Sequence, residues 1–170
     1  MSKRDLKKYL GSLEKDQLEE QILELYDKFD DVRIFYNFAF DPKEDKLIGD
    51  AKFRISKEYF PQNKRKAKAR RSVAHNQIRH FLQLGVEPNL IADVMLFNIE
   101  IAQTFSSDRQ NITESFSKSL FKSFEQAVNF IHQNELISEF MRRMQKITDE
   151  AEAQKWPNLY QFEKLTDQFN

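Results

Sequence analysis

The chain has 170 residues, a length typical of one domain, and its hydrophobic share of 40% suffices for a core without a metal ion or a disulfide. The absence of cysteine excludes disulfides and thiolate chemistry, and three widely spaced glycines form neither a dinucleotide-binding loop nor a P-loop. The 27 basic and 27 acidic residues balance, but residues 1–85 hold 19 basic and 14 acidic side chains, whereas residues 86–170 hold 8 and 13. This asymmetry indicates either an electrostatic partner or two halves that attract each other.

Hydrophobic residues recur at steps of three and four along almost the whole chain, which predicts amphipathic α-helices. Start and stop signals divide the pattern: Ser2 is an N-cap, Gly11 and Gly85 end helices, and Asp41-Pro42 begins one. Residues 32–40 form either a separate helix or a continuation of the preceding one. The expected helices cover 3–10, 12–29 or 15–29, 32–40, 42–60, a stretch ending at 84, 88–105, 112–133, 136–155 and a short one within 159–169.

This series of helices predicts the fold class. Few glycines and few tight-turn signals argue against an all-β protein, and helices with short connections lie mainly antiparallel. We expect an all-α, single-domain antiparallel bundle of seven to nine helices over residues 1–170, or a short stack that resembles an α-solenoid. The helix at 88–105 carries hydrophobic residues on more than one face, so it is expected to be the most buried.

No segment predicts secretion or insertion into a membrane. The N-terminal residues lack the hydrophobic stretch of a signal peptide. The longest hydrophobic stretch, residues 90–105, is too short to span a bilayer and contains Asp93, Asn98 and Glu100. We expect a cytoplasmic protein without a membrane span.

The three histidines do not form a metal-binding pattern. His75 and His80 are five residues apart, which turns them roughly 140° from each other on a helix. No glutamate stands three positions before any histidine, unlike the pattern of di-iron helical bundles. His132 can still approach the other two in space. We predict no metal ion and no cofactor.

Asp93 and Glu100 lie in the most hydrophobic predicted helix. Seven residues apart, they share a face but are about 10 Å apart along the helix axis. We interpret them as the solvent side of a nearly buried helix, with Gln103 continuing the stripe. The alternative is a catalytic site, completed by His75 or His80, in which one carboxyl group is desolvated, has a raised pKa and acts as a general acid or base.

The strongest anomaly is a basic segment, residues 64–71. From residue 52 to residue 80 there are ten basic residues and one acid, Glu58. Cations crowded around a helix N-terminus oppose the helix macrodipole and repel one another, so a compensating interaction is expected. The predicted contact residues for a partner or polyanion are the six cations of the segment: Lys64, Arg65, Lys66, Lys68, Arg70 and Arg71.

Three compensating interactions are open. RNA, DNA or anionic lipid would neutralise the segment from outside, with Phe53, Tyr59 and Phe60 as nearby stacking surface. A solvated segment, whose repulsion salt screens, is the second. The third is internal pairing with acidic residues of the C-terminal half, for which the candidates are Glu135, Glu139, Asp149, Glu150 and Glu152.

Three stretches, SKRDLKKYL at 2–10, AKFRISKEYFP at 51–61 and ADVMLFNIEIAQTF at 92–105, resemble a bacterial family of small helical proteins that is grouped only as a domain of unknown function. The resemblance covers nearly the whole chain. It implies a small helical protein and brings no activity, cofactor or site residue.

The features above favour a non-enzymatic helical interaction or adaptor module that contacts a protein partner, or a second copy of itself, through the basic segment. One alternative is a nucleic-acid-associated protein that uses residues 64–71. The other is an enzyme with a site around Asp93 and Glu100.

Overall fold

The structure is a computed structural model that describes residues 1–62, 65–107 and 113–169. These residues form nine α-helices, one short 3-10 helix and no β-strand, which confirms the all-α prediction. Contacts divide the chain into two units, Met1–Lys43 and Glu44–Asn170. The single domain over residues 1–170 stays a prediction. No helix among the described residues combines the length and the hydrophobicity needed to cross a membrane.

The first unit contains three helices: α1 (Lys3–Leu10), α2 (Lys15–Lys28) and α3 (Asp30–Phe40). Ser2 and Asp5 form a capping box at the start of α1, in which the Ser2 hydroxyl accepts from the Asp5 N–H and the Asp5 carboxylate accepts from the Ser2 N–H. The extended backbone of Phe29 (φ −122°, ψ 114°) ends α2, so residues 30–40 form a separate helix. None of the three helices contains a buried residue.

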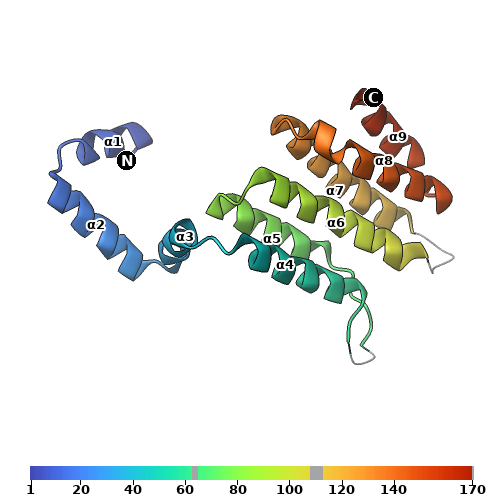
Figure 1. The fold of residues 1–170 in the computed structure, drawn as a ribbon, viewed down its shortest axis with the longest axis horizontal. Helices are drawn as coiled ribbons and strands as arrows, with labels where there is room; N and C mark the ends of the chain where they lie inside the picture. The colour runs from blue at the N-terminus through green and yellow to red at the C-terminus, as the bar shows by residue number, and fades with distance from the viewer. Residues whose placement is uncertain (63–64, 108–112, 170) are drawn as a thin grey trace. The chain divides into compact units, whose positions relative to one another are not determined.

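The second unit is an antiparallel helical bundle, as predicted (Figure 1). Each helix contacts the next one and runs in the opposite direction, and α6 contacts both α4 and α8 (Figure 1). The helices are α4 (Glu44–Tyr59), α5 (Arg71–Leu84), α6 (Pro88–Ser107), α7 (Glu114–Gln133), α8 (Ile137–Ala153) and α9 (Leu159–Thr166), followed by a 3-10 turn at Asp167–Phe169.

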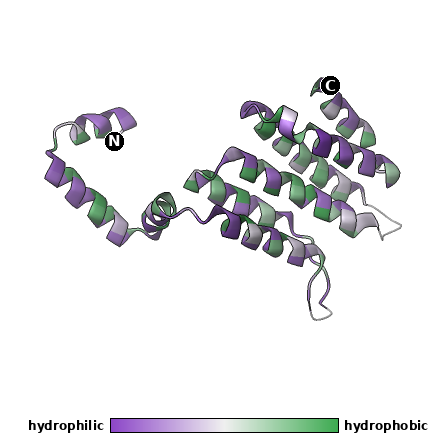
Figure 2. Ribbon diagram, in the orientation of Figure 1, coloured by the Kyte–Doolittle hydropathy of each residue, from purple (hydrophilic) through white to green (hydrophobic). Residues whose placement is uncertain are grey.

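The core of this unit is centred on α6. This helix contacts α4, α5, α7 and α8 and is hydrophobic along most of its length (Figure 2). Its buried residues are Ile91, Ala92, Val94, Met95, Leu96, Asn98, Ile99, Ala102, Gln103 and Ser106, more than in any other described helix, which confirms the prediction of a most buried helix. Gly85 ends α5 in the left-handed conformation (φ 75°), where glycine avoids the strain of a side chain.

The start of α4 differs from the prediction. We expected Asp41-Pro42 to cap and begin this helix, but α4 begins at Glu44. Asp41 instead ends α3, because its backbone N–H donates to the carbonyl of Asn37 at 3.1 Å. Because α4 begins at Glu44, Asp41 lies outside the N-cap position, which is the residue directly before the helix.

Candidate anion-binding groove

The basic segment folds back on the end of α4. The backbone N–H groups of Lys68 and Ala69 donate to the Glu58 carbonyl at 3.0 and 2.9 Å, which satisfies an acceptor that the helix end leaves free. The Arg70 guanidinium donates two hydrogen bonds to the Glu58 carboxylate, from Nε to Oε2 at 2.9 Å and from Nη2 to Oε1 at 2.8 Å. These hydrogen bonds hold the pKa of Glu58 below its usual value. The segment is therefore fixed to α4 by the one acid of the region.

Arg71 is also used within the fold. Its Nη1 donates to the Ser119 carbonyl at 2.7 Å and to the Ser119 hydroxyl at 3.0 Å, which joins the start of α5 to α7. Because both acceptors are neutral, the positive charge of Arg71 is retained.

The other described cations of the segment surround a pocket of about 340 Å³. It is lined by Arg65, Lys66 and Lys68, by Lys57 of α4 and by the paired residues Glu58 and Arg70. Pro61 and Gln62 also line it. Over the described residues, the ion pairs do not include Lys57, Arg65, Lys66 or Lys68. Among the described residues, the pocket thus combines five cations with one carboxylate that is already neutralised.

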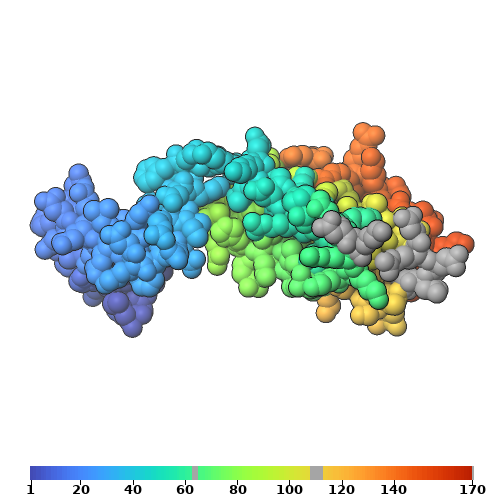
Figure 3. All heavy atoms as spheres, turned by 90° about the horizontal axis from the view of Figure 1, so that it is seen from below, coloured from blue at the N-terminus to red at the C-terminus, as the bar shows by residue number. Residues whose placement is uncertain are grey.

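An aromatic pocket adjoins the cationic one. Its lining residues include the aromatic residues Tyr59, Phe60 and Phe105. The others described are Pro61, Arg65, Lys66 and Ala67. Pro61, Arg65 and Lys66 belong to both pockets, so the two are continuous; we call them together the cationic groove. Figure 3 shows the atoms of α4 and of the residues after it (teal to green) side by side on one face.

The three aromatic residues predicted as stacking surface differ in exposure. Tyr59 is buried, with 3% of its surface exposed, and belongs to the core. Phe53 is half exposed, but the Lys57 ammonium lies over its ring, 4.1 Å from the centroid. Phe60 is 44% exposed and lines the groove. Of the three, Phe60 is the ring available to a ligand.

The structure separates the six predicted contact residues into groups. Arg65, Lys66 and Lys68 line the groove, Arg70 is paired with Glu58, and Arg71 is bonded to α7, whereas Lys64 lies outside the described residues. The predicted internal partners in the C-terminal half were wrong, because the described segment forms its ion pair with Glu58.

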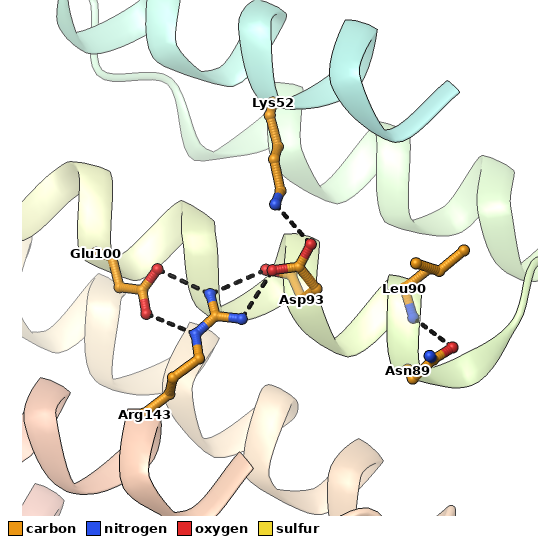
Figure 4. Close-up of polar contacts among 6 residues, drawn as sticks. All are labelled: Lys52, Asn89, Leu90, Asp93, Glu100 and Arg143. Atoms are coloured by element: carbon orange, nitrogen blue, oxygen red, sulfur yellow. Dashed lines mark hydrogen bonds and ion pairs between the residues drawn. The ribbon is translucent and has the colours of Figure 1, made fainter. Parts of the chain in front are cut away.

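Asp93 and Glu100 form a charged chain with two residues that the sequence analysis missed (Figure 4). Arg143 of α8 donates to the Asp93 carboxylate at 2.7 Å and to both Glu100 carboxylate oxygens at 2.9 and 2.8 Å. The Lys52 ammonium of α4 lies 2.5 Å from the other Asp93 oxygen. These ion pairs connect α6 to both α4 and α8.

This arrangement corrects only part of our interpretation of the carboxylates as the solvent side of α6: Asp93 and Glu100 are partly exposed, Glu100 to 36%, but both are paired with other helices, and Gln103 does not continue the stripe. Asp93 has 26% of its side chain exposed and lies between α4 and α8, and Gln103 is buried, donating to the Ile147 carbonyl at 2.7 Å. Burial alone raises the pKa of Asp93, but hydrogen bonds and charges of Lys52 and Arg143 outweigh it and lower that pKa below 3.8. A general acid requires the opposite shift, so the geometry favours a structural role.

The histidines lie on other helices than the ion-paired residues around Asp93, which belong to α4, α6 and α8. His75 and His80 are on α5 and His132 is on α7, where its ring contacts Phe169. Over residues 1–62, 65–107 and 113–169, no three His, Asp or Glu side chains come together as metal ligands would.

His75 supplies a prediction about acid sensitivity. Burial lowers its pKa below 6.5, and the charges of Arg71 and Arg79 lower it further. The His75 imidazole therefore binds a proton more readily in the unfolded chain than in the folded one. The contribution of neutral His75 to the free energy of unfolding is present above about pH 6.5 and is lost as the pH falls below it. A His75→Gln variant should lose less unfolding free energy than the original protein between about pH 7.5 and pH 5.5 in urea titrations. An equal loss in both proteins would contradict the assignment.

Fold and site together define an all-α protein with a cationic groove beside an exposed aromatic ring. The chain belongs to the family described as a family of unknown function (DUF6155), which matches residues 1–170 and confirms the family resemblance. No curated protein and no solved structure matches the chain.

Proposed function

We propose that this protein is a non-enzymatic helical interaction module that binds an anionic partner through the cationic groove. The observation that carries the proposal is the group of four cations, Lys57, Arg65, Lys66 and Lys68, which line one pocket without an ion pair in the described chain. The acid of the region, Glu58, is occupied by Arg70 through two hydrogen bonds.

The backbone supports this role because it fixes the end of the segment, residues 68–71, before a ligand arrives. Hydrogen bonds from Lys68 and Ala69 to the Glu58 carbonyl anchor the segment, and Arg71 anchors its end to α7. A site that is ordered in advance loses less conformational entropy on binding. The mutual repulsion of the cations is relieved when an anion neutralises them.

The test is retention on a heparin column, with binding measured at two salt concentrations. A variant that replaces Lys57, Arg65, Lys66 and Lys68 with glutamine should elute at lower salt and bind heparin at least tenfold more weakly, because fewer counterions are released. The matched control has the same change in net charge on exposed lysines outside the groove: Lys46, Lys146, Lys155 and Lys164.

The control variant should bind like the original protein, and circular dichroism should give both variants the helicity of the original. If the two variants lose the same amount of retention, net charge rather than the groove explains binding, and the proposal is wrong. It is equally wrong if the original protein is not retained at low salt.

A further inference from the structure

We propose that the ligand of the cationic groove is single-stranded nucleic acid, with a base stacked on Phe60 and phosphates bound by Arg65 and Lys66. This inference rests on the proposed function of the groove and names its ligand class. Its basis is that the same two cations line both the cationic pocket and the pocket that holds Phe60.

The ring of Phe60 is held from behind. It makes an edge-to-face contact with Phe105, with ring centroids 6.0 Å apart and planes at 82°, and Phe105 in turn packs against the buried Tyr59 at 5.5 Å. With 44% of its surface exposed, Phe60 keeps ring surface for a ligand. A fixed, exposed aromatic ring is what a stacked base requires, because every base offers a flat π-face.

Charge and ring surface alternate over a short distance in the groove. Arg65 and Lys66 adjoin Phe60 on one side and the cations Lys57 and Lys68 on the other. A nucleic-acid strand offers the complementary alternation, with a base beside each phosphate, whereas an acidic peptide offers carboxylates without regular planar groups. The bases of a duplex are stacked on each other, whereas a single strand can place a base on Phe60 without first breaking that stacking and the base pair.

A second cationic pocket lies at the C-terminal end of the segment. Arg71, which follows Arg70 of the groove in the chain, borders a pocket with Ser115, Ser119 and two lysines of α7, Lys118 and Lys122. Glu114 also lines this pocket and pairs with Lys118 at 2.6 Å, which leaves Arg71 and Lys122 as phosphate ligands. We therefore expect a strand of several nucleotides rather than a mononucleotide to bind best.

The experiment measures fluorescence anisotropy with labelled single-stranded RNA and DNA of one mixed sequence, with the duplex as competitor. Phe60→Leu should weaken binding to the single strands about tenfold, because it removes the stacking ring, while its retention on heparin stays unchanged. Phe60→Tyr should bind like the original protein. The matched control is Phe40→Leu, which removes an aromatic ring that is 84% exposed in the other unit and should change nothing.

Each failure has a different meaning. If the original protein is retained on heparin but binds neither oligonucleotide, this inference is wrong and the proposed function stands. If the protein neither binds heparin nor binds an oligonucleotide, the inference and the proposed function are both wrong. Tighter binding to the duplex, or to vesicles of phosphatidylserine and phosphatidylcholine, assigns the groove to another ligand and overturns the inference. If Phe60→Leu binds the single strands as tightly as the original protein does, no base stacks on Phe60 and the inference is wrong. A preference for single-stranded RNA over single-stranded DNA, or the reverse, supports the inference and shows which of the two nucleic acids is the ligand.

Discussion

Replacing Phe162 with alanine is expected to lower the free energy of unfolding by about 3–5 kcal/mol, the range for deleting a large aromatic side chain from a packed core. Phe162 of α9 is fully buried and stacks on Phe124 of α7, with centroids 5.1 Å apart and planes at 21°. It also makes edge-to-face contacts with Phe121 and Trp156, at 5.3 and 5.4 Å. The substitution therefore removes a ring that fixes α9 to α7.

The measurement is urea-induced unfolding followed by circular dichroism, with the slope of the transition compared as well as its midpoint. The control is Tyr160→Ala, because Tyr160 lies on the same helix but is 69% exposed. It should cost less than about 0.5 kcal/mol, as surface substitutions usually do. Similar losses for both variants would mean that α9 does not depend on the aromatic cluster.

The helices were largely predictable because their signals are local. Ser2 and Gly85 cap helices as their residue types indicate, and the hydrophobic faces of α6 predicted its central place. Asp41 shows where local signals conflict. A residue between two helices can end only the first, as Asp41 does, or end one and begin the next, as Phe29 does, and the residue type does not distinguish these cases.

The groove was predictable only in part. A run of cations identified Arg65, Lys66 and Lys68, and proximity in sequence identified Phe60. Phe105 was missed, because it is 45 positions further along the chain and reaches the groove only after α6 packs on α4. The sequence analysis noted Glu58 as the one acid of the region but did not assign it as the anchor, since its pairing depends on the reversal of the chain after α4.

The ion pairs of Asp93 and Glu100 were also predictable only in part, because their partners are distant in the sequence. The spacing of Asp93 and Glu100 correctly put them on one face, about 10 Å apart along the axis. A guanidinium spans that gap, since its donors form a planar fork with bonds in several directions. Nothing near Arg143 in the sequence indicates its partners, which lie 43 and 50 residues away.

Replacing Arg143 with methionine should lower the free energy of unfolding by about 2 kcal/mol at neutral pH. Removing one partner of a fully buried ion pair costs about 3–5 kcal/mol, and solvent reduces this because Arg143 is 29% exposed. Glu100 loses both of its hydrogen bonds, whereas Asp93 keeps Lys52. The matched control is Arg142→Met, which removes an exposed guanidinium from the neighbouring position of α8 and should cost less than about 0.5 kcal/mol.

The pH dependence of this loss distinguishes the ion pairs from simple packing. Because the folded protein holds the pKa of Asp93 below its ordinary value of 3.8, the stabilisation by its charge is fully present above that ordinary value and is lost as the pH falls through the lowered pKa. The difference between the original protein and Arg143→Met should therefore be largest at neutral pH and shrink toward about pH 3. The alkyl part of Arg143 does not titrate, so a difference that stays constant over this range would assign its role to packing alone, and Lys52 would then carry the charge pairing of Asp93.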